Sequence, residues 1–134
     1  MTKQIILTGV VVKGNQLGRK IGFPTANLIP EKDEKLLLNQ GVYAVRVKIA
    51  KKIFDGMANI GIRPTLDLHE MTIEAHLFDF SGDIYGEAIS IVFYDFIREE
   101  QKFSGLEELK SQLEKDKRII RRILSERMEP YPDA

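Results

Sequence analysis

Most of this 134-residue sequence alternates between short apolar segments, rich in β-branched residues, and turns that contain glycine or proline. The segment 41–49 shows the pattern most clearly, because every second residue from Tyr43 to Ile49 is apolar while Arg46 and Lys48 fall between them. A period of two is typical of a strand with one buried face. No alternation of strand and helix patterns indicates a doubly wound parallel sheet, so the chain is constrained to a mainly β fold.

Six segments are expected to form strands, each bounded by turn residues. They are residues 5–13, 25–28, 41–49, 53–60, 72–77 and 88–97. The stretches 30–40 and 61–68 are expected to be loops, since each contains a proline among turn-forming residues. Within 72–77 the apolar residues alternate with Thr72, Glu74 and His76, which places Glu74 on the face opposite the apolar set.

The pattern changes at Ser104, where helical spacing replaces the period of two. Ser104 and Glu107 match a capping box, in which each side chain pairs with a free backbone N–H at a helix start. Apolar residues then recur every three or four positions over about 20 residues, namely Leu106, Leu109, Leu113, Ile120, Ile123 and Leu124. Six strands and one helix predict a single domain over residues 1–134, mainly β, with an antiparallel β-barrel packed against a C-terminal α-helix.

Composition excludes several classes of function. The chain holds 20 Lys and Arg against 20 Asp and Glu, so it lacks the positive charge typical of a protein that binds nucleic acid or a membrane surface. It contains no cysteine, which excludes disulfides, thiolate metal sites and a cysteine nucleophile. The start lacks the features of a signal peptide, and no run approaches the roughly 18 apolar residues of a membrane span. A cytoplasmic protein is therefore expected.

Residues 18–27, with the sequence Gly-Arg-Lys-Ile-Gly-Phe-Pro-Thr-Ala-Asn, are the first candidate for a binding site. Glycines let backbone N–H groups approach phosphate oxygens closely, and Arg19 and Lys20 supply positive charge beside them. The spacing does not match the P-loop pattern, however, and a glycine-rich turn by itself is weak evidence. Taken alone, this segment is better interpreted as a plain turn.

Thr25 and Asn27 add a second feature to the same segment. On an extended chain, residues two apart share one face, so a hydroxyl and an amide oxygen lie side by side. Both are hard, neutral oxygen ligands of the kind that can hold Mg²⁺ when substrate phosphates and waters complete its coordination. The alternative, which these two residues alone do not exclude, is that they hydrogen-bond the neighbouring loop.

Glu74 is the candidate for an acid–base group. If the face that carries it lines a closed pocket, its carboxylate can accept a proton from an attacking hydroxyl, and partial desolvation raises its pKa toward that use. If the same face is open to water, Glu74 is an ordinary solvated charge. His76 shares this face, and a lone histidine of this kind is more often structural than catalytic. The strand pattern does not decide between these interpretations.

The segment 18–27 resembles the signature of the riboflavin kinase family, which includes the kinase part of bifunctional bacterial FAD synthetases. Further blocks resemble the family's blocks and follow in the family's order; they are residues 41–45, 58–65, 73–77, 83–86 and 96–103. Together they cover nearly the whole chain, so the resemblance is far more specific than a glycine-rich turn. It implies a six-stranded Greek-key β-barrel with a C-terminal helix, in agreement with the pattern of strands.

The resemblance also implies a role for individual residues. Thr25 and Asn27 would hold Mg²⁺ and the nucleotide, and Glu74 would be the catalytic base that deprotonates the ribityl 5′-hydroxyl of riboflavin. The substrates would be riboflavin and ATP, and the products FMN and ADP. The residues implied to contact the substrates are Gly14, Gly18, Arg19, Lys20, Gly22, Pro24, Thr25, Asn27, Asn59, Gly61, Arg63, Pro64, Thr65 and Arg121. Those from Asn59 to Thr65 would form a loop that encloses the substrates.

Two positions depart from the family's pattern, since Leu66 stands where an aromatic residue often follows Pro-Thr, and Lys13 replaces a common histidine. Neither position supplies a proposed ligand. The adenylyltransferase part of bifunctional members is absent from these 134 residues, although the full-length protein can carry it as a linked domain. Two other classes of function remain: a non-catalytic flavin- or nucleotide-binding barrel, and an interaction domain whose helix docks a partner.

Overall fold

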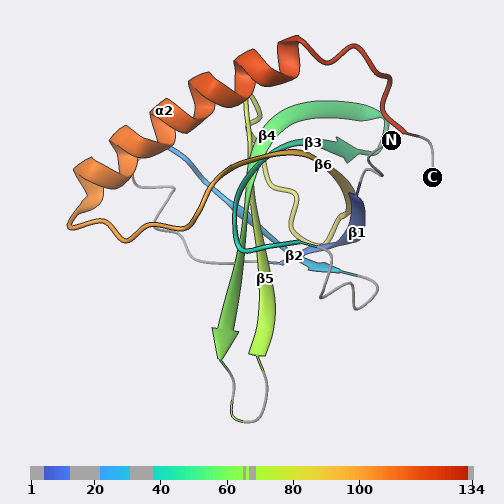
Figure 1. Ribbon diagram of the computed structural model, residues 1–134. Helices are drawn as coiled ribbons and strands as arrows, with labels where there is room; N and C mark the ends of the chain where they lie inside the picture. Colours follow the sequence, from blue (N-terminus) through green and yellow to red (C-terminus); the bar gives the residue numbers. More distant parts are fainter. Residues whose placement is uncertain (1–4, 13–21, 31–37, 65, 67–68, 133–134) are drawn as a thin grey trace.

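The computed structural model describes residues 5–12, 22–30, 38–64, 66 and 69–132. Six strands and one long helix form this part of the chain (Figure 1). They are β1 (Ile5–Val12), β2 (Ala26–Pro30), β3 (Gly41–Ile49), β4 (Lys52–Pro64), β5 (His69–Leu77), β6 (Ala88–Arg98) and α2 (Leu106–Ser125).

The six strands close into an antiparallel barrel in the order β1-β2-β5-β4-β3-β6. Strands β3, β4 and β5 are consecutive hairpin partners, and β6 returns to pair with β3 on the far side, which is a Greek-key connection. Pairing of β1 with both β2 and β6 completes the closure, so the barrel has no free edge. The predicted fold class is confirmed.

Strand β4 is longer than the sequence indicates. Residues 61–64 were expected in a loop, yet β4 pairs with β5 without interruption from Gly56↔Leu77 to Pro64↔His69. Proline lacks an N–H and is tolerated at the end of a strand, so Pro64 ends β4 instead of excluding residues 61–63 from it. Figure 1 shows the resulting β4–β5 hairpin extending beyond the barrel, on the side away from α2.

Two apolar clusters lie on the two sides of the barrel wall. Inside the barrel, alternate residues of each strand pack together, as the period of two predicts; they include Tyr43, Val45, Val47, Ile73, Ala75 and Leu77. Outside, a second cluster fills the space between the wall and α2, and it comprises Phe23, Val42, Ala44, Met57, Phe78, Ile120 and Leu124. The outer face of β3, β4 and β5 is therefore partly covered by the helix instead of being open to water.

Helix α2 begins without the expected capping box. Its N-cap residue is Gly105, which has no side chain, and no side-chain capping hydrogen bond is present. Glu108 accepts a hydrogen bond from the Ser104 N–H at 3.4 Å, so a carboxylate one residue later than predicted serves the helix start. At the other end, the guanidinium of Arg46 donates to the carbonyl oxygen of Leu124 at 2.8 Å, a favourable position for a cation. Strand β3 thus holds the helix C-terminus.

Within the described residues, no helix is both long and apolar enough to cross a membrane.

Candidate active site

Three polar side chains form a row across the outer face of the barrel. Glu74 on β5 lies directly opposite Asn27 on β2 and opposite Asn59 on β4. Directly opposed residues of antiparallel strands place their side chains on the same face. Their neighbours Ala26, Ala58 and Ala75 point into the barrel core, so the three polar side chains point outward, toward the side that α2 covers.

A cavity of about 820 Å³ lies over Asn59 and Glu74 of this row, whereas Asn27 does not line it. Its floor is the outer face of β4 and β5, and its walls are the segment that follows β6 and the first turns of α2. One part of the wall is apolar, formed by Phe23, Val42, Met57, Phe103, Leu109 and Leu113. Another part is polar and includes Thr25, Asn59, Glu74, Arg98, Glu99 and Glu100. A cavity of this size and mixed lining fits a small organic molecule.

Glu74 is partly withdrawn from water in this cavity. Burial raises the pKa of the Glu74 carboxyl above its usual value of 4.5, and the negative charge of Glu100 raises this pKa further. A carboxylate with a raised pKa is better suited to accept a proton near neutral pH. The sequence left open whether Glu74 is a solvated charge, and the structure places it in a cavity.

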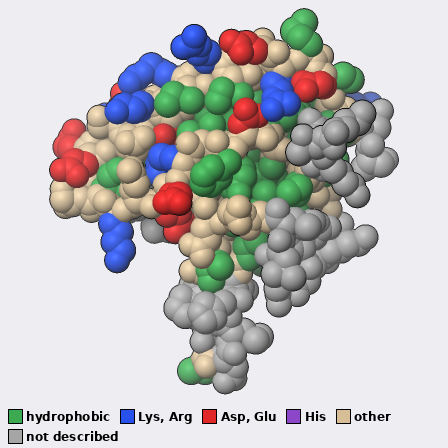
Figure 2. Space-filling model, in the orientation of Figure 1, with side chains coloured by type: hydrophobic (Ala, Val, Ile, Leu, Met, Phe, Trp, Pro, Cys, Tyr) green, Lys and Arg blue, Asp and Glu red, His purple; other side chains and the backbone are tan. Residues whose placement is uncertain are grey.

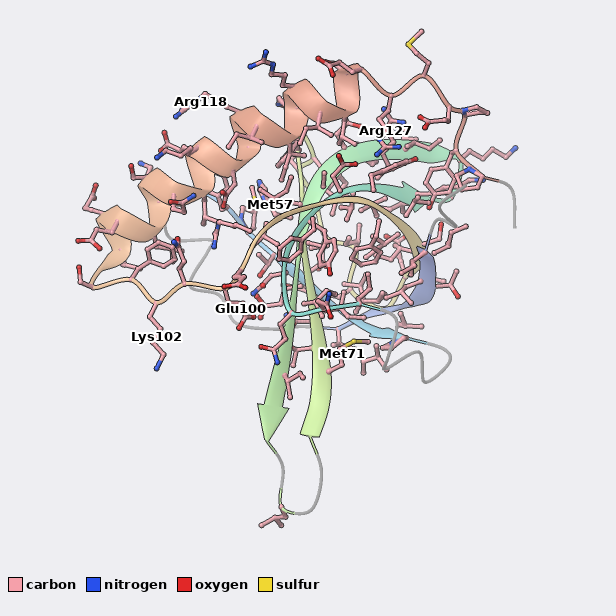
Figure 3. The ribbon with its side chains drawn as sticks, viewed as in Figure 1. Met57, Met71, Glu100, Lys102, Arg118 and Arg127 are labelled. Carbon is pink, nitrogen blue, oxygen red and sulfur yellow. The ribbon has the colours of Figure 1, made fainter. Side chains whose placement is uncertain are left out.

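The Glu100 carboxylate lies against Gly61 of β4, on the barrel face that carries Glu74. A Cβ atom built on Gly61 would lie 2.9 Å from Oε1 of Glu100 and 2.9 Å from the Thr72 hydroxyl oxygen, closer than real Cβ contacts. The absent side chain at Gly61 therefore makes room for the Glu100 carboxylate against β4. In Figure 3, Glu100 lies beside the strands, whereas Lys102 extends away from them.

The two amides beside Glu74 have unsatisfied polar atoms. Nδ2 of Asn27 and Oδ1 of Asn59 are buried and have no hydrogen-bond partner in the described part of the chain. A buried amide without a partner is costly, at roughly 1–3 kcal/mol per group, and such groups are rare in folded proteins. Two of them on either side of one carboxylate are typical of a site whose ligand supplies the missing partners.

Thr25 connects the large cavity with a smaller one. The smaller cavity has a volume of about 290 Å³, and Thr25 lines both. Its other lining residues include Pro24, just before Thr25, and Phe80, Ser81, Asp83 and Tyr85 from the turns between β5 and β6. Two adjoining cavities that share a hydroxyl can accept two substrates next to each other.

An ion pair fixes the wall formed by residues 98–105. Asp116 on α2 is fully buried and accepts three hydrogen bonds from the Arg98 guanidinium, at 2.8–3.0 Å. Gln112 donates a further hydrogen bond to Asp116 at 2.9 Å. Arg98 is the last residue of β6 and lies over the Phe103 ring, with its Cζ 5.9 Å from the ring centroid. These contacts tie the end of β6 and the following segment to the helix.

The remaining residues named from the sequence are spread more widely. Gly22 is exposed with φ +86°, Asn59 and Gly61 are strand residues, and the backbone of Arg63 and Pro64 belongs to β4, so the expected enclosing loop is absent at 59–64. Arg121 does not line either cavity. It pairs with Asp79 at 2.5 Å and lies over the Phe78 ring. Gly14, Gly18, Arg19, Lys20 and Thr65 lie outside the described residues.

Arg98, Glu100 and Phe23 line the cavity, although the sequence predicts no individual role for them. The signal that the sequence does carry is their place within blocks that resemble those of the riboflavin kinase family. Their position depends on how α2 packs against the barrel, and no local pattern of residues reports that packing.

Metal ligands in this site are few. In the described part of the chain, no group of three or more histidine, aspartate, glutamate or cysteine side chains could hold a metal ion. Thr25 and Asn27 offer neutral oxygens near Glu74. Such a pair suits a cation that takes most of its ligands from a bound nucleotide.

Comparison with known proteins places this geometry in context. The family model described as Flavokinase, riboflavin kinase, matches residues 1–124. The bifunctional riboflavin kinase/FMN adenylyltransferase of Haemophilus influenzae is 47% identical over 81% of this chain and 35% of its own length. The enzyme of the same name from Bacillus subtilis is 41% identical over 89% of this chain and 38% of its own length. The RNA-binding riboflavin kinase RibR of Bacillus subtilis is 48% identical over 83% of this chain and 47% of its own length.

Solved structures show the same fold. The riboflavin kinase of Trypanosoma brucei superposes with a TM-score of 0.66 at 26% identity, over 93% of this chain and 82% of that one. A crystal structure from Streptococcus pneumoniae, described as a macrolide-efflux protein, superposes with a TM-score of 0.80 at 40% identity, over 87% of this chain and 38% of that one. This chain spans between a third and a half of the length of the curated relatives named above. The match over residues 1–124 and the shared barrel show that the chain belongs to the riboflavin kinase family.

Proposed function

We propose that this chain is an ATP:riboflavin 5′-phosphotransferase, which transfers the γ-phosphoryl group of Mg-ATP to the ribityl 5′-hydroxyl of riboflavin. The products are FMN and ADP. The observation that carries the proposal is the partly buried Glu74 carboxylate, set between two unsatisfied amides on the floor of a cavity that adjoins a second one at Thr25. The names of the relatives support the choice of riboflavin.

Glu74 acts as the general base. Its raised pKa favours proton transfer from the 5′-hydroxyl as that oxygen attacks the γ-phosphorus. The O–P bond to the hydroxyl oxygen forms while the bond to the β-phosphate oxygen breaks, so ADP leaves with the electron pair and Glu74 retains the proton. Phosphoryl transfer depends mostly on positioning and charge stabilisation, so Glu74 also orients the hydroxyl.

Thr25 and Asn27 would hold the cation that accompanies the nucleotide. The fit rests on their hydroxyl and amide oxygens, which are hard and neutral, and on the position of Asn27 opposite Glu74. Mg²⁺, when bound with ATP, neutralises the phosphate charge that builds up during transfer.

The large cavity accepts riboflavin and the small one part of the nucleotide. Phe23, Met57, Phe103 and Leu109 give the large cavity an apolar wall suited to a flat flavin ring, while Asn59 and Glu74 face the ribityl hydroxyls. The turn from Ser81 to Tyr85 gives the smaller cavity a more polar lining. The two substrates then meet at Thr25, beside the base.

The test is an assay of products. The purified chain is incubated with riboflavin, Mg²⁺ and either ATP or CTP, and FMN, FAD and riboflavin are separated by chromatography. FMN formed in step with ADP supports the proposal. Tight flavin binding without FMN formation under either nucleotide favours the alternative of a non-catalytic flavin-binding barrel.

A further inference from the structure

His76 is a buried polar side chain that lines the large cavity, and the mechanism above gives it no role. It lies two residues after Glu74 on β5, so its side chain is on the same outer face, and it is 8% exposed. Its ring is packed between two others, with centroids 5.0 Å from Phe23 and 5.6 Å from Phe78.

One nitrogen of this ring bonds the backbone of the glycine-rich segment. Nδ1 of His76 is 2.7 Å from the carbonyl oxygen of Pro24, and because a carbonyl oxygen only accepts, Nδ1 donates. Burial lowers the pKa of His76, the Pro24 carbonyl raises it, and the positive charge of Lys117 lowers it again, with a net shift below 6.5. The ring is therefore neutral at pH 7, with its proton on Nδ1.

This hydrogen bond lies where the pairing of the strands stops. Strand β2 pairs with β5 at Asn27↔Glu74 and Ala26↔Ala75, and continuation of that ladder would set Thr25 opposite His76. Pro24 has no N–H to donate, so a backbone ladder cannot continue regularly through it. The His76 side chain instead bonds the Pro24 carbonyl, which belongs to the same peptide group as the Thr25 N–H.

We propose that His76 is a positioning residue, which holds the Pro24–Thr25 peptide against β5 and so sets the place of the Thr25 hydroxyl relative to the Glu74 carboxylate. The inference rests on the proposed function, in which Thr25 binds the nucleotide with its cation. It assigns His76 no part in the phosphoryl transfer itself. Loss of the hydrogen bond displaces Thr25 and weakens nucleotide binding, while Glu74 stays in place. Phe23, which packs on the His76 ring, also lines the riboflavin cavity, so riboflavin binding changes as well, but less.

The test compares His76 variants whose side chains place a hydrogen-bond donor at different positions or lack one. In His76→Asn the side-chain amide nitrogen stands close to the position of Nδ1, whereas in His76→Gln it reaches farther out, and His76→Leu fills the space without a donor. We expect KM for Mg-ATP to rise about tenfold in His76→Gln and His76→Leu, the size of one lost buried hydrogen bond. We expect His76→Asn to stay within about threefold of wild type. In His76→Gln and His76→Leu we expect KM for riboflavin to change less than KM for Mg-ATP.

A second arm uses Thr25→Val, which removes the hydroxyl at nearly constant shape. If His76 acts through Thr25, adding His76→Leu to Thr25→Val raises KM for Mg-ATP far less than it does in the wild-type chain. Three results would each overturn the inference. The first is an equal effect of His76→Asn and His76→Leu on nucleotide binding, and the second is an equal loss of riboflavin and nucleotide affinity. The third is full additivity of His76→Leu with Thr25→Val. Circular dichroism confirms that each variant is folded.

Binding of Mg-ADP in the absence of riboflavin separates this inference from the proposed function. A wild-type chain that makes no FMN contradicts the proposed function. In that case the affinities of His76→Asn and His76→Leu for Mg-ADP, measured by calorimetry, still decide whether His76 positions the nucleotide segment.

Discussion

Glu74, the proposed base, occupies a position that disfavours its charged form and so costs stability. Folding places its carboxylate in a partly buried position and brings Glu100 close to it, and both effects disfavour the charged form. The sequence predicted the strand face that carries Glu74, because alternation with Ile73 and Ala75 is a local property. It did not predict the cavity, because Glu100 and α2 reach that face from distant parts of the chain.

Removing the charge of Glu100 tests the electrostatic part of this description. In Glu100→Gln the pKa of Glu74 falls, although burial still keeps this pKa above its usual value. Since the proposed base must be deprotonated to act, we expect the acidic limb of the pH profile of kcat/KM to shift to lower pH. Glu99→Gln is the matched control, because Glu99 also lines the cavity but is not a cause of the Glu74 shift. An unchanged acidic limb in Glu100→Gln would contradict this account.

Neutralising Glu74 itself is expected to stabilise the fold at neutral pH. A carboxyl whose pKa is raised by folding binds its proton more tightly in the folded state. The contribution of Glu74 to stability is therefore greatest below 4.5 and decreases as pH rises through its folded pKa. Glu74→Gln lacks this decrease. Thermal unfolding should show a gain of about 0.5–1 kcal/mol for the variant at pH 7, the usual size for a stabilising substitution. At pH 4 the gain should nearly vanish, and a gain of equal size at both pH values would point to another cause.

At the scale of elements, the strands were predicted better than their ends. Periods of two and of about 3.6 residues are set by local geometry, so six strands and one helix follow from the sequence. Residues 61–64 were wrongly expected in a loop, because Gly61 and Pro64 resemble turn residues while their pairing with β5 is a tertiary effect. The capping box at Ser104 also failed, since the helix begins at Leu106 with Gly105 as its N-cap.

The Arg98–Asp116 ion pair is the main polar link between β6 and α2, and its loss should be costly. Asp116→Asn leaves the Arg98 guanidinium partly unpaired at a buried site, which destabilises by about 3 kcal/mol. It also loosens the wall formed by residues 98–105, so KM for riboflavin should rise. Chemical denaturation and steady-state kinetics measure the two effects.

A matched control is the exposed ion pair between Arg121 and Asp79. Asp79 has a positive φ of 57°, which asparagine tolerates, so Asp79→Asn removes the charge without backbone strain. Its cost should stay below about 1 kcal/mol. Equal costs for Asp116→Asn and Asp79→Asn would show that burial does not govern the strength of these pairs.

At the scale of the whole molecule, the charges are balanced in number, and they are mixed on the face shown in Figure 2. Figure 2 shows acidic and basic side chains side by side along the part of the surface where α2 lies. No field of one sign is expected to attract a polyanion, which agrees with a small-molecule substrate. The fold of this molecule was predictable because the strand pattern favours an antiparallel barrel and the family resemblance implies the same one, whereas the two cavities depend on the packing of α2 and of the turns after β5.

The 134-residue chain is expected to make FMN without making FAD. The riboflavin kinase model matches residues 1–124, and the relatives named as bifunctional with an FMN adenylyltransferase are far longer than the segment that matches. Prolonged incubation of the chain with FMN, ATP and Mg²⁺ should leave FMN unchanged on chromatography. A bifunctional relative run in parallel provides the positive control, and FAD formed by this chain alone would contradict the expectation.

The most direct test of the central claim is a comparison of kcat between the wild-type chain and Glu74→Gln, with riboflavin and Mg-ATP at saturation. A general base contributes roughly 10²–10⁴-fold, so kcat should fall by that factor while the dissociation constants for riboflavin and Mg-ADP change little. A Glu74→Gln variant that turns over at close to the wild-type rate would contradict the assignment of Glu74 as the base.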